Sequence, residues 1–246
     1  MPVPDLSTSQ LEHLSDRSMP GRERTWVDGW VCRAADGVTS RANCCTPLGP
    51  IGDSISATVD AVDSWYRGRD LPTVFQLWEG ADFAITTELD RRGYTTIEGA
   101  EVMARTLHDA PTAPASGHRI ELDDGLERRL AVEDDADRLA ELALSPLTKI
   151  VAGCWDGSRL RCSGVGVLDG AALGVFAMST APADRRQGLA SSILAALLGE
   201  AVARDLDVAW LQVAPSNTGA KQLYERFGFA TAHAYHYRAA PPLGLS

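Results

Sequence analysis

The chain has 246 residues, of which 45% are hydrophobic, and carries a formal net charge of −10. This length allows one large core or two modest ones, and the acidic charge argues against nucleic acid or an anionic membrane as the main partner. The first twenty residues are polar and interrupted by prolines, and no run approaches the roughly 18 apolar residues of a membrane helix. We therefore expect a cytoplasmic protein that binds neither nucleic acid nor membrane.

The cysteine spacing matches neither a metal-binding knuckle nor an obvious disulfide framework. We expect buried, reduced thiols and no metal site. The cysteines are Cys32, Cys44, Cys45, Cys154 and Cys162.

The first part of the chain predicts alternating strands and helices. A turn at Asp36-Gly37 separates two strand-like runs, and a helix, a strand and a second helix follow before Gly93. The predicted strands are Trp26–Arg33, Val38–Cys44 and Thr73–Leu77, and the predicted helices are Ser54–Tyr66 and Ala81–Arg91.

Residues 108–117 (HDAPTAPASG) have the composition of a linker, because Pro, Ala, Ser and Gly replace any apolar periodicity. We therefore divide the chain into residues 1–107, a linker at 108–117, and residues 118–246.

The second part predicts the order strand, helix, three antiparallel strands, helix, strand, helix, strand. Turn dipeptides at Asp156-Gly157 and Asp169-Gly170 separate the three strands, and Asn217 and Gly228 suit the two ends of the last helix. The predicted segments are His118–Leu122, Asp134–Leu144, Lys149–Trp155, Arg159–Leu168, Ala172–Thr180, a helix from Leu189, Val208–Val213 and a helix after Asn217.

The sequence Arg185-Arg186-Gln187-Gly188-Leu189-Ala190 joins an apolar strand to a helix. Gly188 permits torsions closed to other residues, the helix start offers unpaired N–H groups, and arginines bind phosphate oxygens. The loop therefore suits a diphosphate. Taken alone, it is also compatible with an ordinary strand-to-helix connection carrying two solvated arginines.

Together with the following segments, this loop resembles the GNAT superfamily of acyl-CoA-dependent N-acetyltransferases. The family pattern V-x-P-x-x-R-x-x-G-x-G/A appears from Thr180 to Ala190, with Thr180 in place of the usual Val and Arg186 in place of the commoner Gly. The pattern N-x-x-A-x-x-L/F-Y-x-x-x-G-F appears from Asn217 to Phe229. The resemblance covers residues 118 to 238 and implies an α/β (α+β) GNAT fold with a mixed central sheet flanked by helices.

The resemblance implies an acetyl-CoA site on the strand before the loop, the loop itself and the last helix. The pantetheine and the thioester carbonyl are expected at the splayed strand Phe176–Thr180, although a plain buried strand has the same residues. The residues implied in cofactor binding are Met178, Ser179, Thr180, Arg185, Arg186, Gln187, Gly188, Leu189, Ala190, Ser191, Asn217 and Tyr224.

Tyr224 is the implied catalytic residue, because the family places this hydroxyl beside the departing thiolate. A phenol with an ordinary pKa of about 10 can donate a proton or a hydrogen bond at neutral pH. A tyrosine on a short helix is also compatible with a packing role. Asn217 is compatible with a helix cap, a cofactor contact, or both.

The sequence does not identify a general base or an acceptor. The strand Phe176–Thr180 has no carboxylate, and His233 and His236 are compatible with either a base or packing. Four residues of the first half are candidates for an acceptor site between the two parts of the chain: Trp65, Tyr66, Arg67 and Arg69.

The sequence indicates a diverged internal repeat. Gln76 and Gly93 correspond to Gln212 and Gly228 with offsets of 136 and 135 residues, although chance similarity of two such units is an alternative. The first copy has Leu89 where the second has Tyr224 and lacks an R-x-x-G-x-A loop, so it resembles a degenerate GNAT-like unit. Tandem GNAT proteins, including the mycothiol synthase-like group, are built in this way, and two short sequences are similar to that group: Arg41-Ala42-Asn43 and Tyr235-His236-Tyr237-Arg238.

The resemblance implies a GNAT-type acyl-CoA N-acyltransferase. It would transfer an acetyl group from acetyl-CoA to a primary amine of a small molecule or peptide, by direct attack on the thioester and without a metal. A homodimer is compatible with the sequence. The alternatives are a non-catalytic acyl-CoA-binding sensor and an interaction protein.

Overall fold

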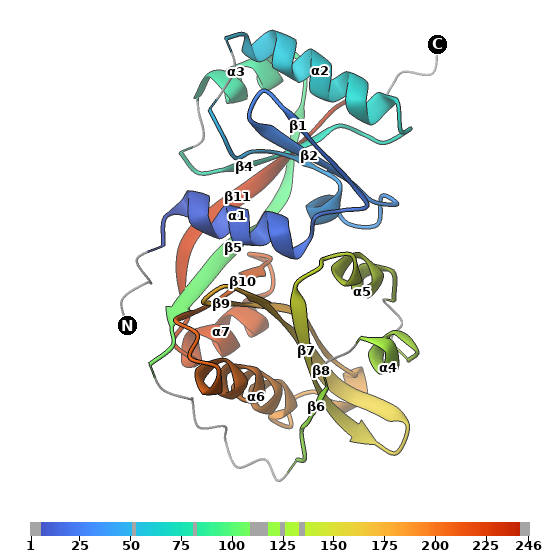
Figure 1. Ribbon diagram of the computed structural model, residues 1–246, viewed down its shortest axis with the longest axis vertical. Helices are drawn as coiled ribbons and strands as arrows, with labels where there is room; N and C mark the ends of the chain where they lie inside the picture. Colours follow the sequence, from blue (N-terminus) through green and yellow to red (C-terminus); the bar gives the residue numbers. More distant parts are fainter. Residues whose placement is uncertain are drawn as a thin grey trace.

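The computed structural model describes residues 6–50, 53–80, 83–108, 118–123, 126–132 and 136–241 (Figure 1). These residues form one mixed sheet of eleven strands in the order β1-β2-β3-β4-β11-β5-β10-β9-β8-β7-β6. The strands are β1 (Glu23–Val27), β2 (Trp30–Ala34), β3 (Cys45–Pro47), β4 (Val74–Trp78), β5 (Thr95–Thr106), β6 (Glu121–Asp123), β7 (Thr148–Asp156), β8 (Arg159–Asp169), β9 (Ala172–Thr180), β10 (Val208–Val213) and β11 (Ala230–Ala239). The helices are α1 (Thr8–Ser18), α2 (Ile55–Arg67), α3 (Phe83–Arg91), α4 (Glu127–Leu130), α5 (Ala136–Ala143), α6 (Leu189–Ala203) and α7 (Thr218–Arg226).

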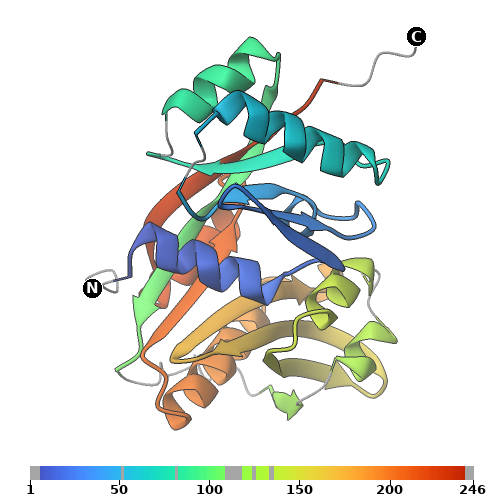
Figure 2. The ribbon, with the colours of Figure 1, turned by 45° about the horizontal axis from the view of Figure 1, so that its top comes forward.

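The predicted α/β fold with a helix-flanked mixed sheet is confirmed. Helices α6 and α7 pack on one face of the strands β7–β10 in a core that includes Ile193, Leu197 and Leu211. Helices α1 and α5 cover the opposite face with Leu11, Leu139 and neighbouring side chains. Helices α2 and α3 pack on β2–β4 at the other end of the molecule (Figure 2).

The first predicted hairpin is wrong in its turn. The chain reverses at Asp28-Gly29, where both residues have positive φ (44° and 80°), as a two-residue hairpin turn requires. A strand over Trp26–Arg33 is therefore interrupted, and Val38–Cys44 is a loop with a 3-10 turn at Ser40–Ala42. The side-chain oxygen of Asn43 accepts hydrogen bonds from the backbone of Ala35 (2.7 Å) and Gly37 (3.3 Å), which holds this segment as a loop.

Helix α1 was not predicted from the sequence. A reciprocal capping box starts it: the Ser7 hydroxyl accepts from the Gln10 backbone N–H (3.2 Å), and the Gln10 side chain accepts from the Ser7 backbone N–H (2.8 Å). The helix lies across the middle of the sheet (Figure 1). It accepts hydrogen bonds from Gln76 of β4 on Glu12 (2.6 Å) and from Gln212 of β10 on Ser15 (3.0 Å).

Strand β5 joins the two parts of the chain into one sheet, because it lies between β11 and β10. In β4 and β11, Gln76 pairs with Tyr237, and in β10 and β5, Gln212 pairs with Val102. The offsets are 212 − 76 = 136 and 237 − 102 = 135 residues. The offset seen in the sequence therefore also relates the two pairings, as a duplicated unit with exchanged last strands would require.

The five cysteines are buried and free, as expected. Within the described ranges, no three His, Cys, Asp or Glu side chains gather as a metal-binding group. No helix in the described part of the chain is long and apolar enough to cross a membrane.

Candidate functional site

Strands β9 and β10 are parallel but separate before β9 ends. Their pairing runs from Ala172 with Val208 to Val175 with Leu211, whereas β9 continues to Thr180. Ala177 has a φ of 47°, and a register shift opposite Ser163 and Val165 marks a bulge at this point. Because of the bulge and the separation of β9 from β10, backbone groups of residues 176–180 are not all paired in a regular ladder. A ligand can reach these groups.

The loop after β9 has the geometry of an anion cradle. Arg186 and Gly188 both have left-handed torsions, with φ of 65° and 80°. Gly188 caps α6 without any side-chain hydrogen bond to the helix start, so the first backbone N–H groups of this fifteen-residue helix remain available to an anion. Arg185 Nε donates to the Thr180 carbonyl at 3.3 Å.

Asp184 fixes the start of this loop. Its carboxylate accepts hydrogen bonds from Arg159 (2.7 Å) and Arg161 (2.8 Å). These two hydrogen bonds hold the pKa of Asp184 below its usual range, and the one from Arg159 has the larger effect. The carboxylate is therefore ionised and neutralised, and it does not repel an anion in the loop.

The loop, the splayed strand and α7 enclose one cavity of about 860 Å³. Its lining contains every residue expected to bind the cofactor except Gln187, whose side chain instead accepts from Arg161 (3.0 Å). Six further lining residues were not predicted from the sequence, although the helical spacing after Asn217 was a signal for most of them. These are Asp184, Gly219, Ala220, Gln222, Leu223 and Arg226.

Tyr224 reaches this cavity from α7. Its ring is buried, and burial raises the pKa of its hydroxyl to about 12, against a smaller opposing effect of Arg41. Among the described residues the hydroxyl has no hydrogen-bond partner, yet it is not sealed from solvent. A buried tyrosine usually satisfies its hydroxyl within the protein, so this one is available to a ligand.

Asn217 caps α7, as expected, because its side-chain oxygen accepts from the backbone of Ala220 at 3.2 Å. The predicted left-handed residue after this helix is Gly228, with a φ of 80°.

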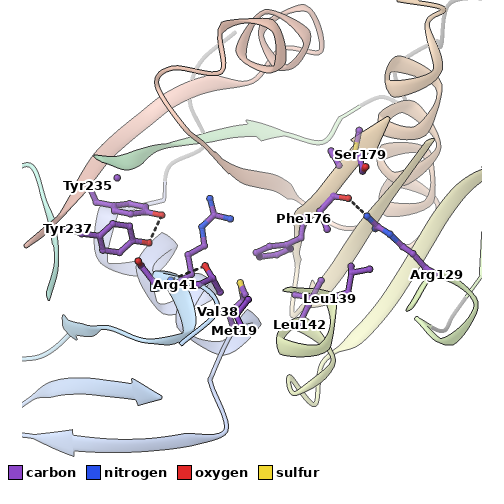
Figure 3. Close-up of a pocket in the computed structure, with 15 residues that line it drawn as sticks. Met19, Val38, Arg41, Arg129, Leu139, Leu142, Phe176, Ser179, Tyr235 and Tyr237 are labelled. Carbon is purple, nitrogen blue, oxygen red and sulfur yellow. Dashed lines mark hydrogen bonds between the residues drawn. The ribbon is translucent and has the colours of Figure 1, made fainter. Parts of the chain in front are cut away.

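A second cavity of about 530 Å³ lies on the other side of the splayed strand (Figure 3). It shares Met178 and Ser179 with the first cavity, so the two meet at this strand. The N-terminal loop at residues 38–41, strand β11 and helix α5 supply other walls. The lining residues are Met19, Val38, Thr39, Ser40, Arg41, Gly99, Arg129, Leu139, Leu142, Phe176, Ala177, Met178, Ser179, Tyr235 and Tyr237.

None of the four candidates from the first half lines this second cavity. The Tyr66 hydroxyl is buried and donates to the Arg33 carbonyl at 3.0 Å. Arg69 stacks on Trp65, 3.9 Å from the ring centroid, and Arg67 is exposed on α2. These four residues therefore lie away from the second cavity, whose wall from the first half of the chain includes Arg41 and its neighbours.

Neither candidate base lines either cavity. His233 is buried with its Nε2 2.6 Å from Glu12 Oε1, which gives it a structural partner. His236 is half-buried, and burial, followed by the charge of Arg238, lowers its pKa. The one carboxylate in the described lining of the two cavities is Asp184, which is occupied by two arginines.

A model of the family described as "Probable histone acetyltransferase Rv0428c C-terminal" matches residues 8–238. The chain belongs to this family. The match includes both cavities and the N-terminal part of the sheet as well as the motif region. The chain is thus a member of a GNAT-type acetyltransferase family, and the resemblance seen in its motifs is confirmed at that level.

Two curated relatives match shorter segments. The probable histone acetyltransferase Rv0428c of Mycobacterium tuberculosis is 41% identical over 73 residues, which is 28% of this chain and 22% of that protein. The [ribosomal protein bS18]-alanine N-acetyltransferase of Haemophilus ducreyi is 41% identical over 63 residues, or 26% of this chain and 42% of that protein. The matched segments therefore span less than half the length of either relative.

Solved structures agree on the fold. A GCN5-related N-acetyltransferase from Kribbella flavida superposes with a TM-score of 0.73 at 16% identity, covering 98% of both chains. A tandem GNAT protein from the clavulanic acid biosynthesis pathway gives a TM-score of 0.60 at 13% identity, over 76% of this chain and 70% of its own. The GNAT fold is thus shared across nearly the whole chain.

Proposed function

We propose that this protein is an acetyl-CoA-dependent N-acetyltransferase that acetylates a primary amine of a small molecule or peptide. One observation carries the proposal: the cavity at the Gly188 loop and the cavity beside Arg41 meet at Met178 and Ser179. A donor and an acceptor can therefore approach each other from opposite sides of one strand. Membership of the family supports the same activity.

The residues of the first cavity suit coenzyme A. The uncapped start of α6 and the arginines at 185 and 186 would hold the diphosphate, and the splayed segment 178–180 would pair with the amide groups of the pantetheine. Bound acetyl-CoA would supply the acetyl group as a thioester.

Tyr224 would act on the leaving group. Its raised pKa of about 12 keeps the hydroxyl protonated at neutral pH. Among the described residues this hydroxyl makes no hydrogen bond that would have to break before it could bind a ligand. It can therefore donate a hydrogen bond or a proton to a thiolate as negative charge develops there.

We propose direct attack of the amine on the thioester. None of the five cysteines lines either cavity, so no thiol is placed there to carry the acetyl group. The acceptor ammonium would lose its proton to solvent, because Asp184 is the one carboxylate in the described lining and is held by Arg159 and Arg161.

Three finer points belong to the same proposal. Residues 1–107 would be a degenerate GNAT-like unit and residues 118–246 the catalytic one, joined by 108–117, and the register relation across β5 supports this duplication. The two sequences that resemble the mycothiol synthase-like group supply Arg41, Tyr235 and Tyr237 to the second cavity, which supports a placement near that group. We also propose a cytoplasmic location.

The test is a panel of amines and peptides incubated with acetyl-CoA and the purified protein, with release of free CoA followed by a thiol reagent. We expect release that depends on an amine, and an acetylated product with a mass increase of one acetyl group. Tight acetyl-CoA binding without turnover of any amine would instead favour a sensor, and absence of binding would leave an interaction protein.

A further inference from the structure

The charged side chains in the described lining of the second cavity are all cationic. Within the described lining, the residues that carry a full charge are Arg41 and Arg129, and no carboxylate is among the lining residues. Arg129 is already engaged, since it donates to the Ala177 carbonyl and supports the bulge of β9. Arg41 is therefore the cation that this cavity offers to a ligand.

Arg41 has no counter-ion within the described part of the chain. The groups that act on its guanidinium are the phenolic hydroxyls of Tyr235 and Tyr237, and no carboxylate is among them. Its side chain points from the N-terminal loop into the cavity, toward the space between Tyr235 and Phe176 (Figure 3). A guanidinium that lines a cavity without an acid partner is free to bind the anionic group of a ligand.

The loop that carries Arg41 is held in place by its own hydrogen bonds. The Thr39 hydroxyl accepts from the Arg41 backbone N–H (3.4 Å), and Asn43 Nδ2 donates to the Thr39 carbonyl (2.8 Å). Asn43 also fixes Ala35 from its other side-chain atom. The guanidinium is thus presented from an ordered turn, and less conformational entropy is lost when it binds a ligand.

One wall of the cavity is apolar. Met19, Leu139, Leu142 and Phe176 are each less than 10% exposed and line it together. In Figure 3, Phe176, Leu139 and Leu142 lie across the cavity from the two tyrosines. A ligand with a charged end can therefore place a compact apolar body against this wall.

We propose that the acceptor is a small amine that carries a carboxylate or phosphate group, with Arg41 binding that anion. This inference rests on the proposed acetyltransferase function and narrows its substrate class. The amine would reach the thioester at Met178 and Ser179, where the two cavities meet, while the apolar body lies against Phe176. A lysine side chain in a basic segment would bring a second cation to Arg41 and is disfavoured for the same reason.

Matched amines test the inference. L-phenylalanine is compared with L-phenylalaninamide, and glucosamine 6-phosphate with glucosamine, so that each pair differs in the anionic group and the two pairs separate carboxylate from phosphate. A lysine-rich peptide is the cationic arm. We expect acetyl-CoA-dependent turnover of at least one anionic amine, with kcat/KM about tenfold or more above its neutral partner.

Arg41→Gln should remove most of that preference by raising KM for the anionic amine, and Arg41→Lys should restore part of it. Arg22→Gln is the matched control, because Arg22 is exposed, pairs with Asp36 at 2.8 Å and lines neither cavity. Acetyl-CoA affinity, measured by calorimetry on each variant, shows that the cofactor site is intact.

The outcomes separate this inference from the function on which it rests. No binding of acetyl-CoA by the wild-type protein contradicts the proposed function. Acetyl-CoA binding with turnover that prefers neutral or cationic amines overturns the anionic acceptor alone. Acetyl-CoA binding with no turnover in any arm overturns the anionic acceptor and also favours the sensor over the enzyme. An equal loss of kcat for both members of a pair in Arg41→Gln also overturns it, because that result would assign Arg41 to thiolate departure near Tyr224.

Discussion

The ring of Tyr224 lies edge-on to the ring of Phe229, with centroids 6.1 Å apart and planes at 62°. This contact secures the ring, while the hydroxyl has no partner among the described residues. The ring of Tyr224 therefore packs while its hydroxyl is available for chemistry, and a substitution that removes only the hydroxyl can separate the two roles.

Tyr224→Phe should lower kcat by about a hundredfold, the usual effect of losing one general acid, with little change in acetyl-CoA affinity. The phenyl ring keeps the packing against Phe229, and no internal hydrogen bond is lost, so the melting temperature should hardly change. Steady-state thiol release and a thermal melt measure both effects. Full activity in this variant would make Tyr224 a packing residue.

The pH dependence of kcat follows from the same group. Burial raises the pKa of Tyr224 to about 12, so the hydroxyl stays protonated up to that pH and is lost as a donor only above it. At saturating substrate, kcat should show no decline from this group between about pH 7 and 10. A fall of kcat with a midpoint near pH 10 that is absent in Tyr224→Phe would show that the pKa is not raised.

The sequence predicted the motif region well because its signals are local. The cap at Asn217, the left-handed Gly188 and Gly228, and the turns after β7 and β8 are each set by a residue and its immediate neighbours. The chemistry of these residues depends little on distant contacts.

The elements that were not predicted from the sequence depend on partners far along the chain. Strand β5 is exposed in its first four residues and mostly buried in its second half, because only that half lies between β10 and β11. Its periodicity is therefore mixed. Helix α1 is built largely of polar residues, and its buried Glu12 is matched by Gln76 and His233, which no local pattern reveals. Arg41 likewise lines the second cavity with residues that are distant from it in the sequence, such as Phe176 and Tyr235.

The two arginines of the loop should contribute to affinity for acetyl-CoA. Arg185→Ala combined with Arg186→Ala should raise the Kd several-fold, and the effect should shrink at high salt because both side chains are exposed. Arg204→Ala is a suitable control, since Arg204 lies just beyond the other end of α6 and pairs with Glu200 at 2.8 Å. Equal Kd values for the double variant and the wild type, measured by calorimetry, would rule out a phosphate contact.

The position of β5 predicts how the chain tolerates division. A fragment of residues 118–246 lacks the strand that lies between β10 and β11, so it would expose the edges of both and lose part of its core. We expect no cooperative thermal unfolding of this fragment alone, and recovery of cooperative unfolding when residues 1–107 are co-expressed with it. A fragment that unfolds cooperatively by itself and binds acetyl-CoA as the full chain does would show that the second unit is independent.

The most direct test of the whole account is acetyl-CoA binding at the Gly188 loop. Gly188 has a φ of 80° at the start of α6, a conformation that a β-branched residue rarely adopts, so Gly188→Val should distort the N–H groups that hold the diphosphate. Gly199→Val is the control within the same helix, because a Cβ at Gly199 meets no atom within 4 Å. Calorimetry should show acetyl-CoA bound by the wild type and by Gly199→Val, and bound several-fold more weakly or not at all by Gly188→Val. The same Kd in all three proteins would contradict the assignment of this loop as the cofactor site.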